Sequence, residues 1–304
     1  MLGVLGGLAL GALGCGGGSA ANATSSSAVA PQAFTSMVVG TAHRGHLQVA
    51  DYPLTKLDEL LDAFHPDLVL VEIRPQPFAE GRFEDGPLEM SYVTVQARRR
   101  GIPVEPIDWY RDEDLGRETS DDPEARRAFE AEVGDKERET DSFAPFAVLN
   151  GAERARDSLA VENAGARFGL GDNAQWHRRQ SWFHRQALAA IEKRHAHRVA
   201  AFVGFAHRPE LDAWLVTSGA ASTSPVRLLA EHPSPPTPKA TPTPSGVNDE
   251  IVHVWQAGID RLRARAERAD PTVRRRLATK IRYWEIAVER RGLCCVDDRA
   301  FAIP

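Results

Sequence analysis

The sequence predicts an α/β fold in which helices cover a largely parallel β-sheet, with a helical hairpin at the C-terminal end. Short apolar runs alternate along the chain with stretches whose apolar residues recur at helical spacing. In addition, the pattern Gly-x-Ala-His-Arg occurs at residues 40–44 and again at 204–208, each time directly after an apolar run. Ligands of open parallel sheets bind at the carboxyl ends of the strands, so both histidines are predicted to lie at a binding edge.

The alternation can be followed element by element. Strands are predicted where a short apolar run ends in a turn or polar residue, at 37–40, 68–71, 102–107, 199–203 and 226–229. Helices are predicted at 54–64, 88–100, 174–195, 209–215, 250–269 and 271–291. Pro66 ends the first helix, Gly101 follows the second, and Pro209 stands at the favourable first position of the fourth. Residues 111–142 are dense in charge and are predicted to form solvated helices or an excursion near the site.

Residues 1–15 have the pattern of a lipoprotein-type signal. A short apolar stretch ends in Ala12-Leu13-Gly14-Cys15, which resembles a bacterial lipobox in which Cys15 becomes lipidated. Plain secretion and an uncleaved apolar tail are the alternatives. Residues 16–33 are rich in Gly, Ala and Ser and are predicted to be a flexible tether. The expected location is therefore the bacterial cell envelope, where the lipid anchor holds the protein on a membrane.

The rest of the chain divides at a stretch rich in Pro and Thr. Residues 34–232 are predicted to form the α/β domain, 233–246 an extended linker, and 247–304 the helical hairpin. The hairpin is expected to dock on the main domain, and an interaction arm is the alternative. Cys294 and Cys295 are expected to be buried or incidental thiols, because adjacent cysteines rarely bond to each other.

Composition and absent motifs exclude several classes of function. The 304 residues are 42% hydrophobic and 26% charged, as in soluble globular proteins, and the net charge of −5 offers no basic field for nucleic acid. The chain has no Gly-x-Ser-x-Gly elbow, Walker loop, His-Glu-x-x-His or dinucleotide-binding glycine motif. The common hydrolase, nucleotidase and dehydrogenase classes are therefore not expected.

Polar residues end four of the predicted strands. They are His43, Glu72, Asp108 and His207, and parallel strands bring their carboxyl ends to one edge of the sheet. Two imidazoles and a carboxylate can bind a divalent metal, which would lower the pKa of a bound water and let it attack a carbonyl. Without a metal, one histidine can act as a general base that Glu72 orients.

Further polar residues flank this set. Arg44, Arg74 and Arg208 are predicted to hold an anionic group or an oxyanion, or else to form surface salt bridges. His46 lies close enough in sequence to His43 to be an additional ligand or to orient one.

At these residues the chain resembles the TraB/PrgY/GumN and Tiki family, within a superfamily that includes ChaN-type haem-binding lipoproteins and erythromycin esterases. The resemblance rests on residues 38–43, 66–72 and 203–207 and spans residues 36–216. The family often has an arginine several residues after the glutamate, for which Arg74 and its rival Arg82 are the candidates. It also has an Arg-Asn pair before the second histidine motif, for which Arg185 is the nearest candidate.

The resemblance implies three functional hypotheses. Tiki proteins are metal-dependent proteases, which implies a hydrolase of peptide or amide bonds in which His43 and His207 bind Mn²⁺, Co²⁺ or Zn²⁺. Glu72 would be a ligand or general base, and Asp108 would orient the ligands. The second hypothesis is a non-enzymatic lipoprotein that binds haem or another small ligand, as ChaN does. The third is a metal-free esterase with His43 as the base.

Overall fold

The computed structural model describes residues 33–110, 122–134, 143–168, 173–233 and 247–301. Cys15, the predicted signal, and nearly all of the predicted tether and linker lie outside these residues. The described part belongs to one compact unit, residues 31–304. None of its helices is both long enough and apolar enough to cross a membrane.

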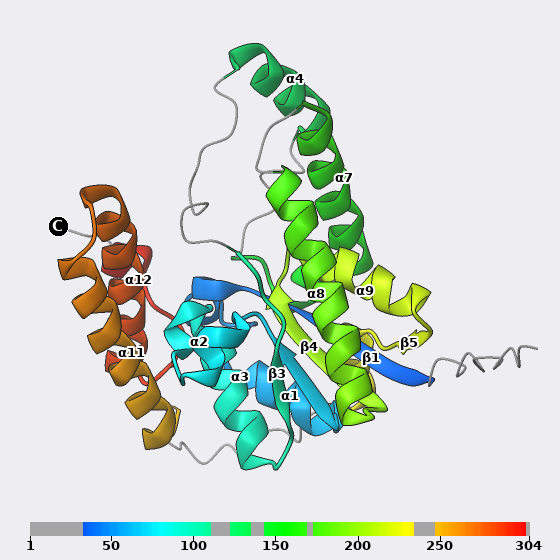
Figure 1. Ribbon diagram of the computed structural model, residues 1–304, viewed down its shortest axis with the longest axis horizontal. Coiled ribbons are helices and arrows are strands. Elements are labelled where there is room, and N and C mark those ends of the chain that lie inside the picture. The colour runs from blue at the N-terminus through cyan, green and yellow to red at the C-terminus, as the bar shows by residue number, and fades with distance from the viewer. Residues whose placement is uncertain (1–32, 111–121, 135–142, 169–172, 234–246, 302–304) are drawn as a thin grey trace, which may run out of the picture. The chain divides into compact units, whose positions relative to one another are not determined.

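One sheet of five parallel strands forms the centre of this unit (Figure 1). The strands are β1 (Phe34–Thr41), β2 (Leu68–Val71), β3 (Val104–Pro106), β4 (Arg198–Gly204) and β5 (Ala220–Ser222), in the spatial order β3-β2-β4-β1-β5. β4 lies between β1 and β2 and pairs in parallel with both, so Gly204 is level with Thr41. The predicted fold class is confirmed, and the two histidine motifs follow adjacent strands.

Eleven helices are described around the sheet, together with three short 3₁₀ segments. The helices are α1 (Thr55–Phe64), α2 (Pro75–Ala79), α3 (Leu88–Arg99), α4 (Pro123–Val133), α6 (Phe146–Leu149), α7 (Ala152–Phe168), α8 (Asn173–Arg194), α9 (Arg208–Thr217), α10 (Pro225–Glu231), α11 (Asp249–Glu267) and α12 (Pro271–Glu289). The 3₁₀ segments are η1 (His43–Leu47), η2 (Phe83–Asp85) and η4 (Asp298–Phe301). Each helix expected from apolar spacing is present.

Helices cover both faces of the sheet, and β1 shows why. Met37 and Val39 point into a core shared with α1, α3 and the C-terminal hairpin, whereas Val38 points into a second core shared with α8 and α9. All three side chains are buried, which matches a continuous apolar run rather than an alternating one. α4 and α7 add a small third cluster of Phe129, Val133 and Ala164.

The C-terminal hairpin, α11 and α12, packs on α3 and shares its core. Trp255 is fully buried, and its indole N–H donates a hydrogen bond of 2.8 Å to the Ser91 hydroxyl of α3. Gly258 lets the two hairpin helices approach closely, because a Cβ there would lie 2.5 Å from the ring of Trp284. The hairpin therefore belongs to the core that supports the sheet edge.

Two expectations were wrong. Residues 226–229 form part of α10 rather than a strand, because the Ser224 hydroxyl caps a helix that begins with Pro225 at its favourable first position. The fifth strand is β5, a short edge strand that follows Gly219. Cys294 and Cys295 are bonded to each other instead of being free thiols.

Candidate functional site

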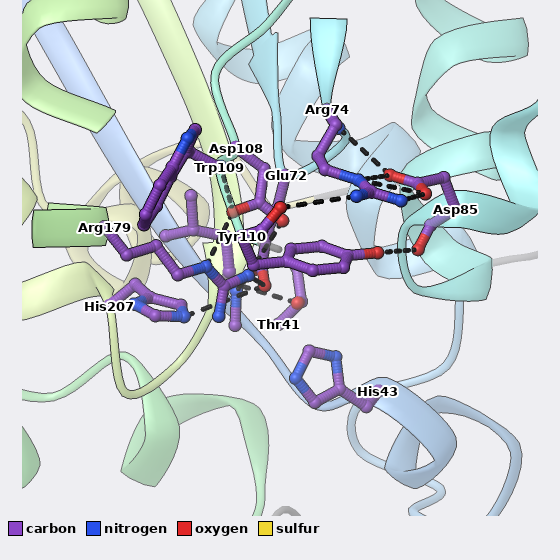
Figure 2. Close-up of polar contacts among 12 residues, drawn as sticks. Thr41, His43, Glu72, Arg74, Asp85, Asp108, Trp109, Tyr110, Arg179 and His207 are labelled. Atoms are coloured by element: carbon purple, nitrogen blue, oxygen red, sulfur yellow. Dashed lines mark hydrogen bonds and ion pairs between the residues drawn. The ribbon is translucent and has the colours of Figure 1, made fainter. Parts of the chain in front are cut away.

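The polar residues that follow the strands meet at one edge of the sheet. Figure 2 shows Glu72 after β2, Asp108 after β3, His43 after β1 and His207 after β4 directed toward a common region. Arg179 reaches the same region from α8. Four of these five residues were predicted from the sequence, and Arg179 was not.

His43 is paired with a buried carboxylate. Its Nδ1 lies 2.8 Å from Oε1 of Glu89, in the first turn of α3, and the Thr41 hydroxyl donates to the same oxygen at 2.7 Å. Burial raises the pKa of Glu89, but His43 outweighs it and brings that pKa to about 2. Burial conversely lowers the pKa of His43, and Glu89 followed by Glu72 raises it above its ordinary value. The result is a carboxylate–imidazole dyad.

The other ring nitrogen of His43 faces the open site. A Cβ placed on Gly204 would lie 2.8 Å from Nε2 of His43 and 3.3 Å from Oε2 of Glu72. The His43 backbone has φ +49°, a left-handed conformation that is uncommon outside glycine. Its carbonyl accepts a hydrogen bond of 3.0 Å from the Tyr283 hydroxyl of α12. The backbone thus directs Nε2 toward Glu72, and the hairpin holds it there.

Arg179 joins the two buried carboxylates. Its Nη2 lies 2.8 Å from Oε1 of Glu72 and 2.8 Å from Oδ2 of Asp108, and its Nε lies 2.6 Å from Oδ1 of Asp108. Burial raises the pKa of Glu72, Asp108 raises it further, and Arg179 and His43 oppose the shift. Burial lowers the pKa of Arg179, but Asp108 and Glu72 more than reverse this effect. The cluster has one cation for two carboxylates.

His207 is buried and neutral. Its ring stacks on Trp176 with 4.3 Å between centroids, and Nδ1 lies 2.9 Å from Oε1 of Gln180. Because that amide oxygen accepts, Nδ1 carries the proton and Nε2 is left 3.7 Å from Oε1 of Glu72. Burial, then Arg179 and His43, lower the pKa of His207 well below its ordinary value.

The ligands predicted for a divalent ion, His43, His207 and Glu72, each have a protein partner. No three His, Cys, Asp or Glu side chains of the described residues are grouped so that they could hold one. Both oxygens of Glu72 already accept hydrogen bonds, one from Arg179 and one from the Gly204 N–H. A metal ion bound to Glu72 would therefore share this carboxylate with the Arg179 guanidinium or replace it.

Two of the predicted flanking arginines lie at the site. Arg74 forms a salt bridge with Asp85, with Nε 3.0 Å from Oδ2, and its guanidinium lies 4.1 Å from the ring centroid of Tyr110. Arg44 is exposed beside His43, with its guanidinium 4.8 Å from the ring of Phe143.

The other predicted residues lie away from the reacting groups. Arg208 is buried and donates to the carbonyls of Val38 at 3.2 Å and Gly151 at 3.3 Å. His46 is buried with both ring nitrogens engaged, since Nε2 accepts from the Ala42 N–H and Nδ1 donates to the Tyr52 carbonyl. Burial lowers the pKa of His46 to about 4. His46 therefore has no ring nitrogen left for a ligand.

Two arginines suggested by the family pattern also lie elsewhere. Arg185 is exposed, with its guanidinium 5.8 Å from the ring of Trp182. Arg82 forms a surface ion pair with Glu80. Arg179 takes the place proposed for Arg185, on the face of α8 that also carries Phe183.

A cavity of about 460 Å³ opens over these groups. His43, Glu72, Asp108 and Arg179 line its sheet side. α12 lines the opposite side with Arg276, Thr279, Lys280 and Tyr283. A small-molecule substrate or a peptide segment fits a space of this size.

Gly204 offers a direct test of this geometry. We expect Gly204→Ala to leave the fold intact and to displace the His43 imidazole, because the new Cβ meets Nε2 of His43 at 2.8 Å. In Gly40→Ala the Cβ meets the Phe205 backbone at 2.9 Å instead, so that variant should lose about 1–3 kcal/mol of stability. Urea unfolding and histidine NMR spectra would check both expectations. An unchanged His43 spectrum in Gly204→Ala would contradict the described packing.

Comparisons of the chain with protein-family models, curated proteins and solved structures found no match.

Proposed function

We propose that this protein is a hydrolase of amide or ester bonds in which His43 activates water. The observation that carries the proposal is the His43–Glu89 dyad, whose free Nε2 faces a cavity beside Glu72 and Arg179. A buried carboxylate that fixes a histidine tautomer is a recurring device for general-base catalysis. The metal-free form that the sequence left as its third hypothesis is thus the one that the geometry favours.

In this mechanism neutral His43 takes a proton from water at Nε2, and the hydroxide adds to the substrate carbonyl. Glu89 stays ionised and stabilises the imidazolium. The Arg179 guanidinium, which lines the cavity, supplies positive charge for the developing oxyanion. The imidazolium then returns its proton to the leaving amine or alcohol as the C–N or C–O bond breaks, which yields an acid and an amine or alcohol.

The metal-dependent peptidase implied by the resemblance to the TraB and Tiki family is a second candidate. One observation favours it: Glu89 and Gln180 hold Nδ1 of His43 and His207, and both Nε2 atoms lie near Glu72. Histidines at metal sites are commonly oriented in this way by a partner on the second nitrogen. In this candidate Glu72 binds the ion together with Arg179 or in place of it.

A single set of samples separates the candidates. The purified protein and its His43→Ala and His207→Ala variants are offered Mn²⁺, Co²⁺, Zn²⁺ and haem, desalted, and analysed for bound metal and for hydrolysis of ester and amide substrates. We expect hydrolysis that persists in chelator and falls about 10²- to 10⁴-fold in His43→Ala. Stoichiometric metal lost in both variants would favour the metal-dependent form. Retained haem without hydrolysis would place the protein among binding proteins.

We also propose that the protein is anchored in the bacterial envelope through lipidated Cys15. The lipobox-like residues 12–15 support this proposal. Full-length protein expressed in bacteria should partition into detergent, and Cys15→Ser should remain in the aqueous phase. Equal partitioning of the two would contradict the anchor.

A further inference from the structure

One face of α12 forms the wall of the cavity opposite the sheet. Arg276, Thr279, Lys280 and Tyr283 line the cavity and lie three or four residues apart, which places them on one side of the helix. The hairpin therefore does more than pack against the core, because the polar face of α12 lines the same cavity as His43 and Glu72.

The carboxylates on the sheet side already have cationic partners. Asp85 pairs with Arg74, while Glu72 and Asp108 share Arg179. Against the effect of burial, the charge of Asp85, followed by that of Glu84, raises the pKa of Lys280, but neither carboxylate forms an ion pair with it. Lys280 lies on the α12 wall, so a substrate that enters the cavity meets its ammonium on this side.

Lys280 is the informative member of this wall. Its ammonium donates a hydrogen bond of 3.1 Å to the backbone carbonyl of Asp85, which is a neutral acceptor. Within the described residues no carboxylate lies within 4.0 Å of it. Burial lowers the pKa of Lys280 to about 8, so the group is still mostly charged at neutral pH. A half-buried ammonium without an ion-pair partner indicates that a charge from outside the protein fits here.

The helix also places Lys280 close to a residue that contacts His43. Tyr283 is one turn from Lys280, and its hydroxyl contacts the His43 carbonyl at 3.0 Å. At about 1.5 Å of rise per residue, Lys280 is roughly 5 Å along the axis from Tyr283. Lys280 and His43 line the same cavity, so an anion at Lys280 and a bond held at His43 can belong to one substrate.

We propose that Lys280 binds a carboxylate of the substrate, so that the hydrolase cleaves amide bonds close to a carboxylate, such as those near the C-terminus of a peptide. This specificity rests on the hydrolase proposed above. Replacing the carboxylate by a neutral amide leaves the ammonium without its partner and weakens binding.

The test compares N-acetyl-trialanine as the free acid with the same peptide as its C-terminal amide, using the full chain and isothermal titration calorimetry. We expect the free acid to bind at least about tenfold more tightly, which corresponds to one charge-assisted contact. Lys280→Met should abolish this preference, and Lys280→Arg should keep it. Arg275→Met is the matched control, since Arg275 is the exposed neighbour that does not line the cavity.

The ratio of the two affinities is the readout because a folding defect lowers both and leaves the ratio unchanged. Equal binding of acid and amide by the parent protein, or an intact preference in Lys280→Met, would overturn the inference. Hydrolysis is followed separately by mass spectrometry on the same mixtures. A binding preference without hydrolysis would support the carboxylate site and count against the hydrolase. Hydrolysis of both peptides without a binding preference would support the hydrolase and count against the carboxylate site.

Discussion

Glu89→Gln is expected to lower the pKa of His43 and to reduce hydrolysis about 10²- to 10⁴-fold. In the parent protein, burial lowers the pKa of His43 and Glu89 is the main group that raises it. The amide removes the charge while it preserves the size of the side chain. It also permits the wrong tautomer of His43, because an amide can donate as well as accept.

The pH dependence of the hydrolysis rate follows from the same His43–Glu89 pair. His43 acts as a base only when neutral, so the rate of the parent protein rises with pH through a pKa above 6.5. In Glu89→Gln this rise should move to lower pH, although the maximal rate is smaller. Histidine NMR titration measures the shift of the pKa without a substrate.

Stability should change in a defined pH window. The pKa of Glu89 is 4.5 as an ordinary value and about 2 in the fold. This depression contributes about 3 kcal/mol of stability, present above pH 4.5 and lost as the pH falls toward 2. The raised pKa of His43 expresses the same pair interaction and is not added to it. The deficit of Glu89→Gln in urea unfolding should therefore be largest at neutral pH and shrink in acid.

Glu105→Gln is the matched control for this change. Glu105 lies on β3, with its side chain 16% exposed, and pairs with Lys193 and Arg194 away from the cavity. Its loss should cost less than about 1 kcal/mol and leave the titration of His43 unchanged. An unaltered His43 pKa in Glu89→Gln would mean that the dyad does not form in solution.

The strands of this fold were largely predictable because buried parallel strands are continuous apolar runs. β1, β2 and β4 each carry such a run, and a site residue follows each of them within three residues. β5 could not be found in this way, since Ala220–Ser222 is short and two of its three residues are exposed. The sequence signal at 225–231 was a helix start, Ser224 followed by Pro225, and the apolar residues behind it misled the strand prediction.

The partners of the strand-end residues were harder to predict. Glu89 lies in the first turn of α3, where a carboxylate ordinarily faces solvent and the helix dipole. Its position within Leu88–Val95, a stretch otherwise without charge, was the available signal, and every residue of that stretch is buried. A charge retained inside a buried helix is worth singling out as a site residue.

Only their angular positions around the axis of α8 distinguish Arg179, which faces the site, from Arg185, which does not. They are six residues apart, about 240° around the helix, so one helix cannot direct both to the sheet. Buried Phe183 and Ala187 mark the inner face, and Arg179 is four residues before Phe183. This spacing favours Arg179. The family pattern pointed to Arg185 because a sequence pattern does not record the side of the helix on which a residue lies.

Arg179→Met is expected to destabilise the fold by about 3–5 kcal/mol at neutral pH. The side chains of Glu72 and Asp108 are only 5% and 1% exposed, and Arg179 forms the salt bridges that balance their charges. Without the guanidinium, burial and the charge of Asp108 raise the pKa of Glu72 further above its ordinary value. Protonation then relieves the strain, so the deficit should decrease between neutral pH and about pH 4–5.

Arg185→Met provides a matched control on the same helix. Because Arg185 is exposed, its loss should change stability by less than about 0.5 kcal/mol at either pH. Urea unfolding of both variants at two pH values measures the contrast. Adding Asp108→Asn to Arg179→Met should recover part of the lost stability, since it removes one of the two carboxylates that need a cation. Equal losses for the two arginine variants would show that Arg179 is not the cation that balances Glu72 and Asp108.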